Sequence, residues 1–204
     1  MHLYFVRHGQ SMGNMTGDYS TPTHDRLSPN GRQQAERLAE RLADIHFDAV
    51  YASTAIRAMQ TITPFLQQQG VRATLWPALQ EACWRHERTT PVPLRTAPPI
   101  QYVLLPETTA HFDVLDGYQD LPPTDETYQE GRMRVIDVYR RLVRWHGGRV
   151  ETILVVGHEF AGGRLVELLL GLDPEGRIQH SNTGLTYLIE QDDHTFHLKF
   201  ANRI

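Results

Sequence analysis

Two histidines and two arginines of this sequence follow apolar runs closely, in segments that lie far apart along the chain. Arg7 and His8 end the apolar run at the start of "YFVRHGQSMGN". Arg57 comes shortly after "FDAVYAS", and His158 comes directly after "ILVVG". Guanidinium groups match the oxygens of a phosphoryl group with paired hydrogen bonds. A neutral imidazole can attack phosphorus and divide one displacement into two easier steps. These residue types together suit phosphoryl transfer.

A carboxylate completes this set of side chains. Glu81 follows the segment "RATLWPA", and a carboxylic acid can protonate a leaving alkoxide and then act as a base toward water. Glu87 is a competing candidate for the acid, but Arg85, His86 and Arg88 flank it. Those cations favour its ionised form, which cannot donate a proton. We therefore favour Glu81 as the acid.

Apolar segments predict the strands that would position these side chains. Continuous apolar residues suit a strand that is covered on both faces of a parallel sheet. The carboxyl ends of such strands gather functional groups at one edge of an open sheet. The predicted strands are Leu3–Val6, Phe47–Ser53, Arg72–Ala78 and Glu151–Phe160, with a closing pair, Thr183–Gln191 and Thr195–Asn202.

Caps and apolar spacing predict four helices between these strands. Ser28 is a good N-cap, and Pro29 then occupies the first helical position. A second helix begins at a cap supplied by Ser53 or Thr54, and we expect Pro64 to kink it. The predicted helices cover residues 29–44, 53–70, 127–146 and 162–171.

Strands that alternate with helices predict an α/β fold, a three-layer α/β/α sandwich with a mostly parallel central sheet. The 204 residues are enough for one domain, residues 1–204. Seven of the twelve prolines lie between Pro91 and Pro123, so we expect an irregular insertion at about residues 84–125 that covers the active site and sets substrate specificity. Its aromatic residues either line a substrate pocket or pack the insertion: Trp84, Tyr102 and Tyr118.

Composition excludes several classes of partner and site. The formal net charge of −4 argues against a general nucleic-acid binder, which needs a dense basic surface. Cys83 is the only cysteine, so an intramolecular disulfide and a cysteine zinc site are both excluded. No apolar stretch approaches the roughly 20 residues of a membrane span. We expect a cytoplasmic protein with no membrane partner.

Sequence blocks in a fixed order resemble the signature of the histidine phosphatase superfamily, which includes the cofactor-dependent phosphoglycerate mutases. The blocks are "VRHGQSMGN", "LSPNGRQQAERLAERL", "VYASTAIRAMQT", "LQEACW" with the looser "DETYQEGRMRV", "VVGHEF" and "SNTGLTYL". They extend from Val6 to about Leu188 in the same order as in the family. The resemblance implies a phosphoglycerate mutase-like fold and phosphatase or mutase chemistry.

The resemblance also implies a role for each matching residue. His8 would accept the phosphoryl group, and Glu81 would be the general acid. Asn14 would bind phosphate or orient the loop that carries it. The phosphoryl oxygens would be held by Arg7, Arg57 and His158. The family needs no metal, since this basic clamp supplies the positive charge, and we expect no cofactor for this chain. The implied partner is a phosphorylated small molecule.

Three positions depart from the family pattern. Glu159 stands where the family most often has glycine, and its carboxylate would repel a phosphorylated substrate if it faced the pocket. Asp125 and Arg85 each replace another glycine. The segment "HEFAG" begins like the zinc motif H-E-x-x-H, but Gly162 occupies the place of the second histidine and removes that interpretation.

Three other functions remain open at this point. A mutase would return the phosphoryl group to its substrate, whereas a phosphatase would release phosphate. A non-catalytic relative would only bind phosphorylated ligands, although the presence of His8, Arg7, Arg57 and His158 argues against it. A phosphohistidine phosphatase would act on a protein. Neither the substrate nor the oligomeric state can be read from the sequence.

Overall fold

A computed structural model gives the structure of this chain and describes residues 1–18, 22–83, 92–93, 110–115 and 125–204. Within those ranges a seven-stranded sheet has the order β5-β3-β2-β7-β1-β8-β9, and β4 pairs with β6 apart from it. The strands are β1 His2–Arg7, β2 Ala49–Ala52, β3 Ala73–Leu75, β4 Val92–Pro93, β5 Phe112–Val114, β6 Asp125–Glu126, β7 Thr152–Gly157, β8 Leu185–Glu190 and β9 Phe196–Arg203.

Five neighbouring strands of the seven-stranded sheet run parallel. β1 pairs in parallel with β7, β7 with β2, β2 with β3 and β3 with β5. The closing pair, β8 and β9, joins in antiparallel orientation beside β1. The predicted α/β fold with a mostly parallel central sheet is therefore confirmed.

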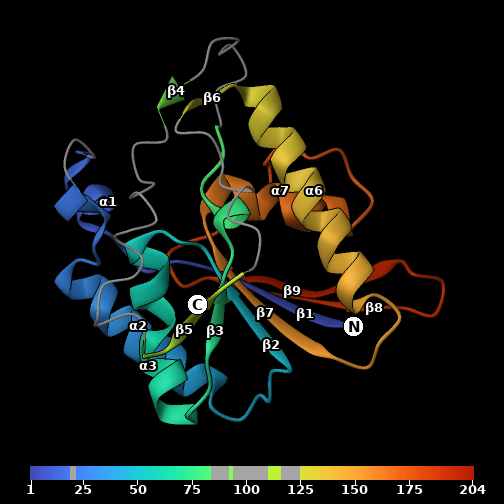
Figure 1. The fold of residues 1–204 in the computed structure, drawn as a ribbon, viewed down its shortest axis with the longest axis horizontal. Helices are drawn as coiled ribbons and strands as arrows, with labels where there is room; N and C mark the ends of the chain where they lie inside the picture. The colour runs from blue at the N-terminus through green and yellow to red at the C-terminus, as the bar shows by residue number, and fades with distance from the viewer. Residues whose placement is uncertain (19–21, 84–91, 94–109, 116–124) are drawn as a thin grey trace.

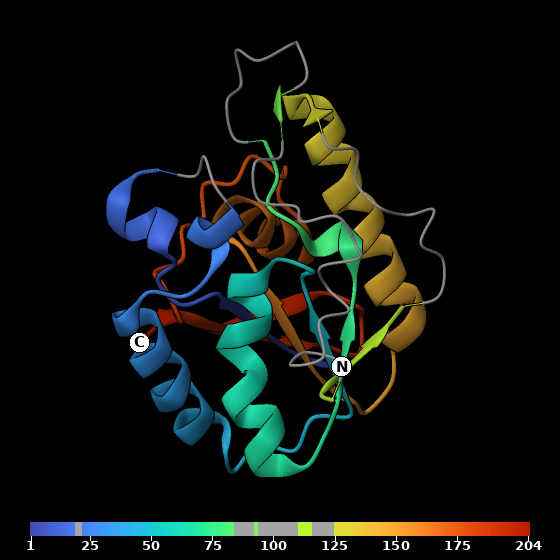
Figure 2. The ribbon, with the colours of Figure 1, turned by 60° about the vertical axis from the view of Figure 1, so that its left-hand side comes forward.

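Helices cover both faces of the sheet (Figure 1). Figure 2 shows α3 and α6 on opposite sides of the strands. The helices of the described part are α1 Met12–Thr16, α2 Pro29–Leu42, α3 Ile56–Gln69, α6 Tyr128–His146 and α7 Glu159–Leu169, with short 3-10 turns η1 Pro22–Asp25 and η2 Pro77–Leu79. Helices were predicted over residues 53–70 and 127–146. The corresponding helices of the structure, α3 and α6, begin and end within three residues of these bounds.

Alternating side chains of β1 supply both halves of the core. Leu3 and Phe5 belong to the apolar cluster under α6 and α7. Val6 belongs to the cluster under α2 and α3, and Tyr4 packs against it. Successive side chains of a strand point to opposite faces of its sheet, so the fully apolar run predicted at this strand is explained by helices on both sides.

Helix α7 packs close to strand β1 at Gly162. A Cβ atom placed on Gly162 would lie 1.9 Å from Cζ of Phe5, so only glycine allows α7 to pack this near to the sheet. The residue that removed the zinc interpretation is therefore a packing residue in this structure. Its lack of a side chain allows the first turn of α7 to lie against the ring of Phe5 in β1.

The structure differs from the sequence predictions at three places. Ala55, which has no side-chain bond to the helix, is the N-cap of α3, so the cap predicted at Ser53 or Thr54 is wrong. The strand predicted to reach residue 160 ends at Gly157, because α7 begins at Glu159. The predicted insertion contributes β5 to the edge of the sheet, where it pairs with β3.

Other expectations for the insertion lie outside the described residues. Trp84, Tyr102, Tyr118 and Glu87 are among them. In the part of the chain that the structure does describe, no helix combines the length and the apolar character that crossing a membrane requires.

Candidate active site

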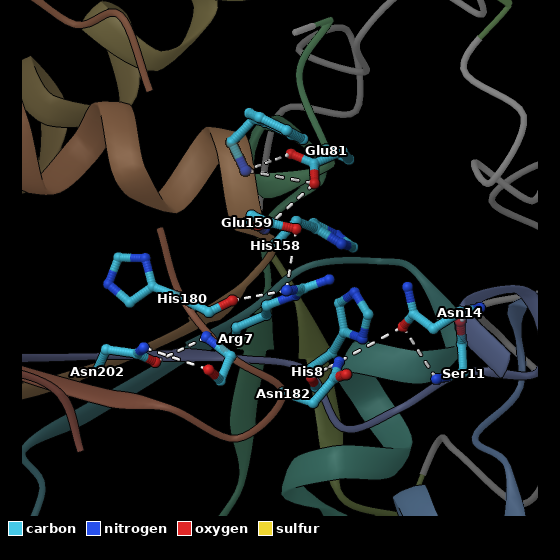
Figure 3. A network of polar contacts seen from close by, with 12 residues as sticks. Arg7, His8, Ser11, Asn14, Glu81, His158, Glu159, His180, Asn182 and Asn202 are labelled. Atoms are coloured by element: carbon cyan, nitrogen blue, oxygen red, sulfur yellow. Dashed lines mark hydrogen bonds and ion pairs between the residues drawn. The ribbon is translucent and has the colours of Figure 1, made fainter. Parts of the chain in front are cut away.

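Four strand ends bring the predicted residues to one edge of the sheet. Arg7 is the last residue of β1 and lies opposite Gly157 of β7. His158 follows β7 directly, and Ser53 follows β2 directly. Because these strands are parallel neighbours, their carboxyl ends open at the same edge. Hydrogen bonds from Arg57 to His8 and His158 show that these side chains lie together, and Figure 3 shows Arg7, His8, His158 and Glu81 at this edge.

His8 directs its unprotonated ring nitrogen to Arg57 at this edge. Its Nδ1 lies 2.7 Å from the carbonyl oxygen of Gly9, which can only accept, so Nδ1 carries the proton. The lone pair therefore lies on Nε2, which accepts from Nε of Arg57 at 3.0 Å. Burial lowers the pKa of His8 well below 6.5, and the charges of Arg57 and Arg7 lower it further. The imidazole is thus neutral and nucleophilic at pH 7.

His158 lies beside His8, with the two ring centroids 5.2 Å apart. Its Nδ1 accepts from Nη2 of Arg57 at 2.9 Å, so its Nε2 carries the proton and donates to Oγ of Ser53 at 2.8 Å. Burial first, and then Arg57, lowers the pKa of His158 well below 6.5. The site therefore holds two neutral imidazoles around one guanidinium group.

Asp25 holds Arg57 in place and was not identified from the sequence. One of its carboxylate oxygens contacts Nη1 of Arg57, and Oδ2 accepts from the backbone N–H of Ile56 at 2.7 Å. Asp25 thus performs the capping of α3 that was expected of Ser53 or Thr54. Burial raises the pKa of Asp25, and Arg57 opposes that shift. Its only sequence signal is its position just before the block "LSPNG".

One nitrogen of the Arg7 guanidinium group contacts two partners (Figure 3). Its Nη1 donates to the carbonyl oxygen of His180 at 2.6 Å and lies 2.9 Å from Oε2 of Glu159. The sequence left open whether Glu159 faces the pocket, and in the structure its carboxylate points to Arg7. Burial raises the pKa of Glu159, with Arg7 opposing the shift and Glu81 adding to it.

Glu81 lies at the start of α7, close to Glu159. Its oxygens accept from the backbone N–H groups of the first three residues of the helix, at 3.0 to 3.4 Å. They also accept from the N–H of Ala82 at 2.9 Å. A carboxylate at a helix N-terminus is stabilised by the helix dipole. The predicted acid therefore lies at the site's edge and also caps α7.

Asn14 is connected to the backbone of His8 through Asn182. Its Oδ1 accepts from the backbone N–H of Ser11 at 3.1 Å, as part of the cap of α1. Asn182 donates to the carbonyl oxygen of His8 at 2.9 Å and contacts Oδ1 of Asn14 at 3.4 Å. Asn182 belongs to the block "SNTGLTYL" but was not predicted as a site residue. These amides connect the loop after β1 to the loop before β8.

Metal-ligand clusters do not occur among the described residues: no group of three or more histidine, cysteine, aspartate or glutamate side chains is placed to hold an ion. The positive charge of this site comes from Arg7 and Arg57. A phosphoryl group would meet guanidinium donors on both sides of a neutral nucleophile, which is an arrangement that suits attack on phosphorus.

We expect the buried His180, whose carbonyl oxygen accepts from Arg7, to make the fold less stable at mildly acidic pH. Burial, followed by the charge of Arg7, lowers its pKa to about 4, whereas an unfolded histidine titrates near about 6.5. The unfolded state therefore binds the proton first, and stability falls as pH falls from 6.5 toward 4. Between pH 7 and pH 5 this group should cost about 2 kcal/mol of unfolding free energy.

Urea unfolding of wild type and His180→Gln at both pH values measures this cost. The wild type should lose about 2 kcal/mol more than the variant on acidification. Equal losses in the two proteins would show that His180 does not carry the effect.

Comparison with known proteins places this geometry in a family. The sequence matches the histidine phosphatase superfamily (branch 1) over residues 3–203. It is 26% identical to the adenosylcobalamin/alpha-ribazole phosphatase of Escherichia coli K12, over 86% of this chain and 82% of the relative. It is 30% identical to a 2,3-bisphosphoglycerate-dependent phosphoglycerate mutase of Brucella anthropi, over 90% and 88%. The alpha-ribazole phosphatase of Shigella flexneri has the same fold, with a TM-score of 0.72 at 22% identity, covering 99% of this chain and 96% of that one.

Proposed function

The chain belongs to the histidine phosphatase superfamily, and we propose that it is a metal-independent phosphatase that hydrolyses a phosphomonoester through a phosphohistidine at His8. One observation carries this proposal: Nδ1 of His8 carries the proton, which leaves the lone pair on Nε2 of a neutral ring that Arg57 contacts and on which the charge of Arg7 acts. A phosphorylated small molecule is the proposed substrate.

The first step transfers the phosphoryl group to the enzyme. Nε2 of His8 attacks phosphorus while the P–O bond to the leaving group breaks, and Glu81 donates a proton to the leaving alkoxide. Arg7 and Arg57 bind the phosphoryl oxygens, and His158 joins them when its Nε2–H turns from Oγ of Ser53 to the substrate. Guanidinium donors that face the developing charge stabilise it in the transition state.

The second step releases inorganic phosphate. Water attacks the phosphohistidine as Glu81 takes its proton, and the P–N bond breaks to return His8 to its neutral form. The contact between Nδ1 and the carbonyl of Gly9 supports both steps, because it holds the ring in one orientation and one tautomer. Asn182 supports the same geometry by binding the backbone of His8.

A mutase is the second candidate function, because a relative that is 30% identical is a phosphoglycerate mutase. The two functions share the phosphohistidine and differ in what takes the phosphoryl group from it. Incubation with a phosphorylated sugar acid distinguishes them: a phosphatase releases inorganic phosphate, whereas a mutase yields an isomeric phosphate ester. A phosphatase acting on a protein phosphohistidine would be detected by a phosphoprotein substrate in the same assay.

The proposed function predicts hydrolysis of p-nitrophenyl phosphate at an undiminished rate in EDTA. The reason is that guanidinium groups, rather than Mg²⁺, neutralise the transferred phosphoryl group. A panel of phosphorylated metabolites, assayed by phosphate release with His8→Ala as the blank, then identifies the substrate. Activity that disappears on chelation and returns with a divalent metal would contradict the metal-free mechanism.

A further inference from the structure

Each arginine of the site already faces a carboxylate. Arg57 is paired with Asp25, and Arg7 is paired with Glu159. Glu81 places a third carboxylate at the start of α7. The two histidines are neutral, and Asp25 and Glu159 already balance the two guanidinium groups. The formal charge of these side chains is therefore zero when Glu81 carries the proton that it donates, and −1 when it does not. A phosphoryl dianion would make this set considerably more negative.

Glu159 is the carboxylate that a substrate encounters most directly. A phosphoryl oxygen that binds Arg7 either displaces Oε2 of Glu159 or shares the guanidinium group with it, because the two lie 2.9 Å apart. In both cases the carboxylate stays beside the dianion. The side chain of Glu159 is only 24% exposed, so solvent screens this repulsion incompletely.

The position of Glu159 also indicates which part of a substrate would lie beside its carboxylate. Its backbone N–H donates to Oε2 of Glu81 at 3.2 Å, and the charge of Glu81 contributes to the raised pKa of Glu159. Figure 3 shows both carboxylates on the same side of Arg7. In the proposed mechanism Glu81 faces the leaving group, so Glu159 faces it as well. The inference therefore rests on the proposed function.

We propose that Glu159 determines specificity by selecting phosphate monoesters whose leaving group carries a cation, namely an ammonium group a few bonds from the ester oxygen. Such a group pairs with the carboxylate and restores the charge balance at the leaving-group side. A neutral or acidic leaving group leaves the repulsion uncompensated. Glycine, which is typical of the family at this position, would exert no such selection.

Two phosphonates of equal length test this proposal without a chemical step. 3-Aminopropylphosphonate carries an ammonium group where n-butylphosphonate carries a methyl group, and neither can be hydrolysed. Calorimetry should show the wild type binding the ammonium ligand roughly 10-fold or more tightly than the butyl ligand, as expected for a hydrogen bond between charged groups. Glu159→Gln should abolish this preference and bind the butyl ligand more tightly than the wild type does.

Two further variants sharpen the test. Asp192→Asn removes one exposed negative charge beyond the far end of β8 and should leave the ratio of the two affinities unchanged. Glu159→Gly should behave like Glu159→Gln and keep or increase turnover of simple monoesters. Equal binding of the two ligands by the wild type, a preference retained in both Glu159 variants, or no binding of either ligand overturns the proposal. Failure of the proposed function is a separate result, an absence of turnover on every monoester, because these affinities do not depend on hydrolysis.

Discussion

Replacement of His8 by alanine is expected to abolish turnover and to remove the covalent phospho-enzyme. The alanine variant has no atom at this position that can form the P–N bond. The remaining donors would still bind the phosphoryl group but would leave only direct attack by water. Loss of the nucleophile should therefore reduce the rate by far more than loss of one binding residue.

Acid quenching of the wild type with labelled substrate should trap an adduct that is labile in acid and stable in base, as expected for phosphohistidine. The adduct should be absent from His8→Ala and present in His197→Ala, which removes an exposed histidine of β9. Near-normal turnover by His8→Ala would end the assignment of the nucleophile.

Removal of Glu81 is expected to slow alkyl phosphates by roughly 10²–10⁴-fold and to affect p-nitrophenyl phosphate much less in the first step. An alkoxide is a poor leaving group that needs a proton in the transition state, whereas nitrophenolate leaves without help. The size of the loss should thus depend on the leaving group. Burst kinetics on both substrates separate this first step from hydrolysis of the phospho-enzyme.

The cap that Glu81 provides for α7 requires a matched variant. Glu81→Ala removes both the acid and the acceptor of the helix N–H groups, whereas Glu81→Gln keeps an acceptor oxygen and removes only the acidic proton. A role in capping alone predicts a uniform loss in Glu81→Ala and little loss in Glu81→Gln. Selective loss on alkyl phosphates in Glu81→Gln supports the acid. Selective loss in Glu87→Ala alone would transfer the role to Glu87.

The sheet was predictable because its signals are local. The apolar run of β1 and the strand before His158 indicate burial on both faces, and the cap at Ser28 locates the start of α2. Parallel strands then bring their carboxyl ends together whatever the side chains are. The addition of β5 was not predictable in this way, because a three-residue strand in a proline-rich segment is too short to show a repeating pattern of apolar residues.

Residue types and their spacing by themselves determined a candidate set of two histidines and two arginines, since each lies at or soon after the end of a predicted strand and the chemistry of phosphate restricts what such a set can do. The resemblance to the family then assigned the nucleophile to His8. Only the tertiary structure decided how these groups are paired. Asp25 neutralises Arg57 from a turn 32 residues away, and Glu159 faces Arg7 from the first turn of a helix 152 residues further along the chain. The physical reason is that a strand end fixes where a side chain begins, whereas its ionic partner depends on elements that meet only after folding. The charge of the site, and hence its proposed selectivity, is a property of the assembled fold.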